Sequence, residues 1–127
     1  MNSMIKAADD NLNNYRIPEA AKAMQEFVDD LSNWYVRRGR ERYWAQGMSQ
    51  DKINAYMTLY TAIVTLCKCA APMVPFITEE IYQNLVRSVD KDAPESIHLC
   101  DYPVCDENMI DEKLEADMEE VLEIVVL

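Results

Sequence analysis

One short run of the sequence combines cations with flat aromatic rings. Guanidinium groups bind phosphates through paired hydrogen bonds, and aromatic rings and guanidinium planes stack on unpaired bases. The run holds four arginines and four aromatic residues within about three helical turns: Trp34, Tyr35, Arg37, Arg38, Arg40, Arg42, Tyr43 and Trp44. Only Glu41 offsets their charge, so the run predicts a cationic surface that can contact nucleic acid.

Two other interpretations of this run remain open. At about 100° per residue, the apolar helix face that begins at Ala20 and includes Tyr35 continues to Arg38 and Arg42. A guanidinium at a core position must be paired, so these two arginines could form ion pairs with acids such as Glu79 or those of the C-terminal segment. The aromatic rings would then pack inside the fold. Alternatively, the run could dock against another protein surface.

The other chemically active side chains predict neither a metal site nor a catalytic site. Cys67 and Cys69 are two apart, which in a helix turns them about 200° away from each other. His98, Cys100 and Cys105 match no zinc-ligand spacing, and a fourth ligand is missing. His98 shares no helix face with a serine or cysteine, so we expect an ordinary loop histidine. We expect free thiols, no metal and no cofactor bound by this chain.

The length and the net charge of the chain indicate a single acidic domain. The chain has 127 residues and a formal net charge of −11, and we expect residues 1–127 to form a single domain. Acids and bases balance over residues 1–87, so the whole excess lies in residues 88–127, which should stay away from bound phosphates. No apolar run approaches the ~20 residues of a membrane span, so we expect no membrane partner. Cysteines without a disulfide pattern indicate the cytoplasm.

Apolar residues recur every three or four positions, which predicts helices over most of the chain. Pro18 and Pro75 stand where helices favour their first residues, Ser49 can cap a helix, and Gly47 can end one. We expect an all-α fold, a helical bundle of four main helices plus a short N-terminal helix, with an extended connector before the last helix. The expected helices cover 2–14, 18–45, 49–71, 75–85 and 110–125, with at most one short strand, at 96–99, inside the connector 88–109. Both ends look cut from a longer chain.

The order of several segments resembles the anticodon-binding helix bundle of isoleucyl-tRNA synthetases, which are class I aminoacyl-tRNA synthetases. The resemblance covers the chain from about Tyr15 onward, and its most specific part is the aromatic and basic run itself. The segments that carry it are Asp30 to Arg38, Arg42 to Trp44, Ala55-Tyr56, Thr58 to Tyr60, Ala70 to Tyr82, Ser96 to Leu99 and Asp101 to Pro103.

The resemblance implies a role in holding an isoleucine-specific tRNA by its anticodon stem and loop. By position in the matching motif, the RNA-binding candidates are Trp34, Arg37, Arg38, Arg40, Arg42 and Trp44. Asn33, a polar residue beside Trp34, is a further candidate for contact with the edge of a base. The parent enzyme would use ATP to attach isoleucine to tRNA in a catalytic domain of the same polypeptide. The class I signature motifs are not found in this sequence, so we expect the chain to have no catalytic activity alone. Two alternatives are a structural bundle that docks on the catalytic domain and an acidic helical adaptor for other proteins.

Overall fold

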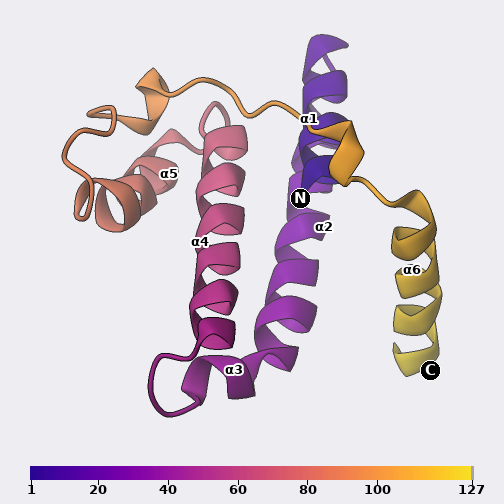
Figure 1. Ribbon diagram of the computed structural model, residues 1–127. Helices are drawn as coiled ribbons and strands as arrows, with labels where there is room; N and C mark the ends of the chain where they lie inside the picture. The colour runs from indigo at the N-terminus through magenta and orange to yellow at the C-terminus, as the bar shows by residue number, and fades with distance from the viewer. Residues whose placement is uncertain (127) are drawn as a thin grey trace.

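The computed structural model describes residues 1–126, and its regular elements are all helical (Figure 1). They are α1 (Asn2–Asn13), α2 (Ile17–Asp30), the π-helical segment η1 (Leu31–Val36), α3 (Arg40–Trp44), α4 (Gln50–Ala70), α5 (Pro75–Tyr82), the π-helical segment η2 (Gln83–Arg87), the 3-10 turns η3 (Ile97–Leu99) and η4 (Glu107–Met109), and α6 (Glu112–Val126). The all-α prediction is confirmed. The short strand expected at residues 96–99 is wrong, because this stretch forms the turn η3. No helix in residues 1–126 is long and apolar enough to cross a membrane.

The first core cluster joins α1 and α2 to the end of α4. Helix α1 lies against the start of α2, and α4 runs back alongside α2 in the opposite direction (Figure 1). Met4, Ile5 and Ala8 of α1 pack with Met24 of α2 and Cys69 near the end of α4. The N-terminal helix predicted from the sequence is therefore present, and it supplies core residues.

A second core cluster attaches α5 and the connector to the end of α4. Its buried members are Cys67, Ala71, Tyr82 and Ile97. The Tyr82 hydroxyl donates a hydrogen bond to the carbonyl oxygen of Pro94 at 2.8 Å, so the same side chain fills the core and holds the connector. Burial raises the pKa of Tyr82 to about 12, which keeps the phenol neutral and able to donate.

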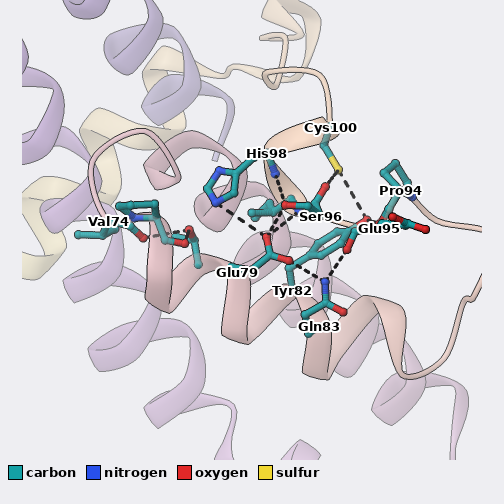
Figure 2. A network of polar contacts seen from close by, with 12 residues as sticks. Val74, Glu79, Tyr82, Gln83, Pro94, Glu95, Ser96, His98 and Cys100 are labelled. Carbon is teal, nitrogen blue, oxygen red and sulfur yellow. Dashed lines mark hydrogen bonds and ion pairs between the residues drawn. The ribbon is translucent and has the colours of Figure 1, made fainter.

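One carboxylate holds η3 against α5 (Figure 2). The Glu79 Oε2 atom accepts hydrogen bonds from the Ser96 hydroxyl at 2.8 Å and from the backbone N–H of Ile97 at 2.9 Å. Its Oε1 atom accepts one from the Gln83 amide at 2.6 Å. Partial burial opposes the charge of this carboxylate, but these donors and the nearby His98 outweigh it and hold the pKa of Glu79 below its usual value.

Replacing Glu79 by glutamine should therefore change how stability depends on pH. A carboxyl whose pKa is lowered by folding stabilises the protein when the pH is above the pKa that this group has in the unfolded state. This contribution is lost as the pH falls through the pKa of the folded state. We expect Glu79→Gln to lower the free energy of unfolding near neutral pH and to flatten its decline toward about pH 3. Urea unfolding over this range measures both effects. Glu80→Gln is the matched control, since Glu80 is exposed and, among the described residues, its carboxylate accepts only from Asn84; an equal change in the two variants would contradict the assignment.

The last helix packs less closely than its apolar periodicity predicts. Leu114, Met118, Val121 and Val125 of α6 are all at least 45% exposed. Helix α6 is tied near its start, where the Ser3 hydroxyl donates to the Glu115 carboxylate at 2.6 Å. Between α6 and the pair α2 and α4 lies a groove of about 960 Å³, the apolar groove, lined mainly by Phe27, Leu31, Trp34, Tyr35, Met57, Ala62, Met118, Val121 and Val125.

Candidate nucleic-acid interface

The aromatic and basic run forms an elbow rather than the end of one straight helix. Helix α2 passes into the π-helical η1, and a turn at Gly39 separates η1 and the next two residues from the short α3. A π turn takes one more residue than an α turn, so the rotation between the side chains before and after η1 departs from that of a regular α-helix. The apolar face does reach Arg38, which lines the apolar groove with Phe27 and Leu31, but this face has left the packed core there: Arg38 is exposed and Arg42 is half-buried.

Gly39 allows the elbow to close tightly. Its N–H donates to the Tyr35 carbonyl oxygen at 2.9 Å. A Cβ atom at this position would lie 2.8 Å from that oxygen and 3.2 Å from the Tyr43 ring. The first distance is shorter than van der Waals contact permits, and the obstacle is backbone, which cannot simply rotate away. No local pattern in the sequence marks Gly39, because the need for glycine here comes from a close approach rather than from a turn signal.

Replacing Gly39 by alanine should therefore open the elbow. We expect Gly39→Ala to lower the free energy of unfolding by about 1–3 kcal/mol, the usual cost of forcing extra atoms into a packed site. Gly47→Ala is a useful comparison, since Gly47 has φ +75° but open space around it. A left-handed alanine there should cost only about 1 kcal/mol. Urea unfolding compares the two variants, and a smaller loss at Gly39 than at Gly47 would contradict the close approach.

Three tyrosines attach the elbow to α4. The buried Tyr43 ring packs edge-on against Tyr56 at 5.0 Å and against Tyr35 at 6.5 Å between ring centres. The Tyr35 hydroxyl donates to the carbonyl of Ala55, and the Tyr56 hydroxyl donates to that of Tyr43, each at 3.3 Å. Burial, with Tyr35 nearby, raises the pKa of Tyr43 to about 12, so its phenol stays neutral. The tyrosines of the run are thus packing residues.

The four arginines of the run have different surroundings. The Arg38 guanidinium lies 4.7 Å above the Trp34 ring, and that of Arg40 lies 5.1 Å above the Trp44 ring. Within residues 1–126, no acidic side chain forms an ion pair with either of them or with the exposed Arg37. A guanidinium stacked on a ring keeps its N–H edge available for another acceptor.

Arg42 alone matches the interpretation in which the arginines form ion pairs. Its Nε and Nη2 atoms donate to the two carboxylate oxygens of Asp51, both at 2.9 Å. Its partner, Asp51, lies in the first turn of α4. The ion-pair interpretation instead names Glu79 or the acids of the C-terminal segment. The guanidinium of Arg42 is therefore already occupied in this structure, whereas those of the other three arginines are available.

A hollow of about 540 Å³, the elbow hollow, lies inside the bend between η1, α3 and α4. Its apolar and aromatic part comes from Val36, Tyr43, Tyr56 and Leu59, and its polar part from Ser32, Asn33, Arg37, Arg40 and Trp44. The structure thus brings together four of the seven predicted residues, Asn33, Arg37, Arg40 and Trp44. Trp34 and Arg38 line the apolar groove instead, and Arg42 lies at the Asp51 bridge. A flat ring could stack in the elbow hollow while the two guanidinium groups hold a neighbouring anion.

The cluster of Ser96, Glu79 and His98 resembles a catalytic triad in composition but not in geometry. A triad histidine must contact the serine hydroxyl, whose proton it removes. Here the Ser96 hydroxyl donates to Glu79 and accepts from the backbone N–H of His98, and the His98 imidazole lies 3.9 Å from the same carboxylate. The hydroxyl is occupied by structural bonds, so this cluster holds the connector in place. Nor do the described residues gather three or more potential metal ligands.

Comparison with known proteins identifies the family of the chain. A family model described as the anticodon-binding domain of tRNA ligase matches residues 1–127. The chain belongs to this family. This anticodon-binding domain is 56% identical over its whole length to the isoleucine--tRNA ligase of Clostridium tetani. It is 46% identical, over 98% of its length, to the isoleucine--tRNA ligases of Dehalococcoides mccartyi and Methanothrix thermoacetophila. The domain spans 12% of the length of each of these relatives.

Proposed function

We propose that this anticodon-binding domain holds the anticodon stem-loop of an isoleucine-accepting tRNA with its elbow. The observation that carries the proposal is the elbow hollow, where Arg37 and Arg40, both without an acidic partner among residues 1–126, flank an aromatic floor. Trp44 stands at its edge with 75% of its surface exposed. The indole of Trp44 is therefore open to a stacking partner.

The residues of the elbow suit a single-stranded loop better than a duplex. Bases in a loop are unpaired and can be turned outward to stack on aromatic rings, whereas bases in a helical stem cannot. In this proposal Trp44 stacks on a loop base and Asn33 hydrogen-bonds to the edge of a base. Arg37 and Arg40 bind the phosphates on either side, and Arg38, stacked on Trp34, provides a further cation.

The distribution of charge orients the RNA. Residues 88–127, which hold the connector and α6, have a net charge of −11, whereas residues 1–87 are neutral overall and carry the arginines of the elbow. RNA is repelled by the first region and attracted by the second. The elbow is therefore the side of the domain that a tRNA approaches.

The role of this domain would be to position the tRNA for a reaction carried out elsewhere. We propose that it belongs to a cytoplasmic isoleucine--tRNA ligase whose other parts use ATP to attach isoleucine. Apart from Glu41, the charged groups of the elbow are guanidiniums, which stay protonated and therefore suit anion binding rather than proton transfer. The domain then contributes affinity and orientation, and its partners are the tRNA and the catalytic part of the ligase.

A salt series with the anticodon stem-loop of an isoleucine-accepting tRNA tests the proposal. Each phosphate contact should contribute about −0.7 to −0.9 to the slope of log affinity against log salt concentration. Arg37→Ala and Arg40→Ala should each weaken binding and reduce the slope by about one contact. Lys22→Ala, which removes an exposed cation of α2 paired with Glu26, is the matched control. A slope near zero, or equal losses from all three variants, would overturn the proposal.

A further inference from the structure

We infer that Asp51, an acidic residue, is a positioning residue for RNA binding by the elbow. It holds α3 so that Arg40 and Trp44 stand at the rim of the elbow hollow. This inference rests on the proposed function, and it assigns to a carboxylate a supporting role at a cationic site. The argument comes from the contacts between α3 and the first turns of α4.

The bridge between Arg42 and Asp51 has the geometry of a specific contact. Two nitrogens of the Arg42 guanidinium meet both carboxylate oxygens of Asp51 at 2.9 Å, and one of them also lies 3.4 Å from the backbone oxygen of Asp51. Such a two-point contact fixes the plane of the guanidinium as well as its distance. The side chains of Arg42 and Asp51 are 41% and 65% exposed, so the bridge adds little to overall stability. Its effect is to set the orientation of α3.

Two further bonds join the end of α3 to α4. The Lys52 ammonium donates to the Ala45 carbonyl oxygen at 2.7 Å, and the Tyr56 hydroxyl donates to that of Tyr43. These carbonyls lie in the last turn of α3 and just after it, where a helix has no partners of its own. Helix α3 has only five residues, too few to be stable alone, so its position depends on α4.

The orientation of α3 determines where the RNA-binding groups stand. Arg40 and Trp44 are four residues apart and therefore share one side of the helix, where they stack on each other and line the elbow hollow. Arg42 lies between them in sequence and points to the other side, toward α4. Releasing Arg42 would let α3 turn about the Gly39 bend, and the stacked pair would leave the rim of the elbow hollow.

This role can be separated from simple electrostatics because the two predict opposite signs. Asp51 carries a negative charge near a surface that binds phosphates, so charge alone predicts that removing it tightens RNA binding. Removing it also frees Arg42 to bind a phosphate, which acts in the same direction. A positioning role predicts weaker binding after the same change, because the hollow loses its shape.

The experiment compares Asp51→Asn with Glu41→Gln in titrations with the anticodon stem-loop. Glu41 is an exposed acid of α3 with no ion-pair partner in residues 1–126, so its variant makes the same charge change without breaking a bridge. We expect Glu41→Gln to tighten binding about twofold. We expect Asp51→Asn to weaken it by about three- to tenfold, the usual coupling within one hydrogen-bonded network. Asp51→Glu, which keeps the carboxylate, should recover most of the loss.

The outcomes separate this inference from the proposed function. If the unaltered chain binds no stem-loop, both fall. If it binds, and Asp51→Asn binds as tightly or more tightly with an unchanged thermal unfolding curve, only the inference falls. Acrylamide quenching of tryptophan fluorescence without RNA gives an independent check: Asp51→Asn should alter the exposure of Trp44, and Glu41→Gln should not. Equal quenching in all variants would also overturn the positioning role.

Discussion

Replacing Arg37, Arg38 and Arg40 together by alanine is expected to abolish most of the affinity for the anticodon stem-loop. Three lost phosphate contacts should reduce the steepness of the log–log salt dependence by about 2 to 3 and weaken binding at low salt about a hundredfold. The reason is that these guanidinium groups have no acidic partner among residues 1–126, so none is neutralised within the fold. Fluorescence titration over a salt series measures both quantities.

A matched control separates the elbow from net charge. Replacing Lys6, Arg16 and Lys22 by alanine removes the same three charges from α1 and the start of α2, away from the elbow hollow. This variant should keep most of the affinity and most of the salt dependence. Equal losses in the two triple variants would mean that RNA responds only to the charge of the whole chain.

Replacing Tyr82 by alanine is expected to have the largest effect on stability. Tyr82 is 2% exposed, it belongs to the second core cluster, and its hydroxyl holds the connector at Pro94. Removing a buried aromatic side chain costs about 3–5 kcal/mol of the free energy of unfolding. Urea unfolding followed by circular dichroism measures the loss.

The conservative variant separates the ring from the hydroxyl. Tyr82→Phe keeps the packing but leaves the Pro94 carbonyl without its donor, so we expect a loss of about 1–2 kcal/mol. The connector should then become more accessible to proteases, since this bond is one of those that hold it. A loss below about 1 kcal/mol in Tyr82→Ala would contradict the placement of Tyr82 in a packed core.

The sequence predicts the helices well because their signals are local. Prolines at the first turns of α2 and α5 and the cap of α4, where the Ser49 hydroxyl accepts from the N–H of Lys52, are all as expected. The aromatic and basic run can also be identified from residue type alone, because arginines gathered beside aromatic rings suit phosphates and unpaired bases. In the structure, four of the seven candidate residues line one hollow.

The geometry of the elbow depends on contacts that local patterns do not contain. Helical projection assumes a constant rotation per residue, and the π-helical η1 changes that rotation just before the arginines. The need for Gly39 arises from the close approach of the Tyr35 carbonyl oxygen and the Tyr43 ring, and the bridge from Arg42 to Asp51 spans a loop. No periodicity encodes these pairs.

The same limit applies to the acid that holds the connector. The ion-pair interpretation assigns Glu79 to the arginines of the run, whereas its carboxylate bonds to Ser96 and Ile97, which follow it by 17 and 18 residues. For α6, the apolar periodicity correctly predicts a helix, but it does not tell how closely the apolar face packs. The closeness of this packing depends on how the other helices are placed.

The chain contains two tryptophans, Trp34 and Trp44, and both lie in the elbow, which gives a direct measurement of the central claim. A ¹H–¹⁵N spectrum contains one indole signal for each. On addition of the anticodon stem-loop, the Trp44 indole signal should move or broaden strongly, because a base stacks on that ring. RNA binding that leaves both indole signals unchanged would show that the elbow does not hold the RNA.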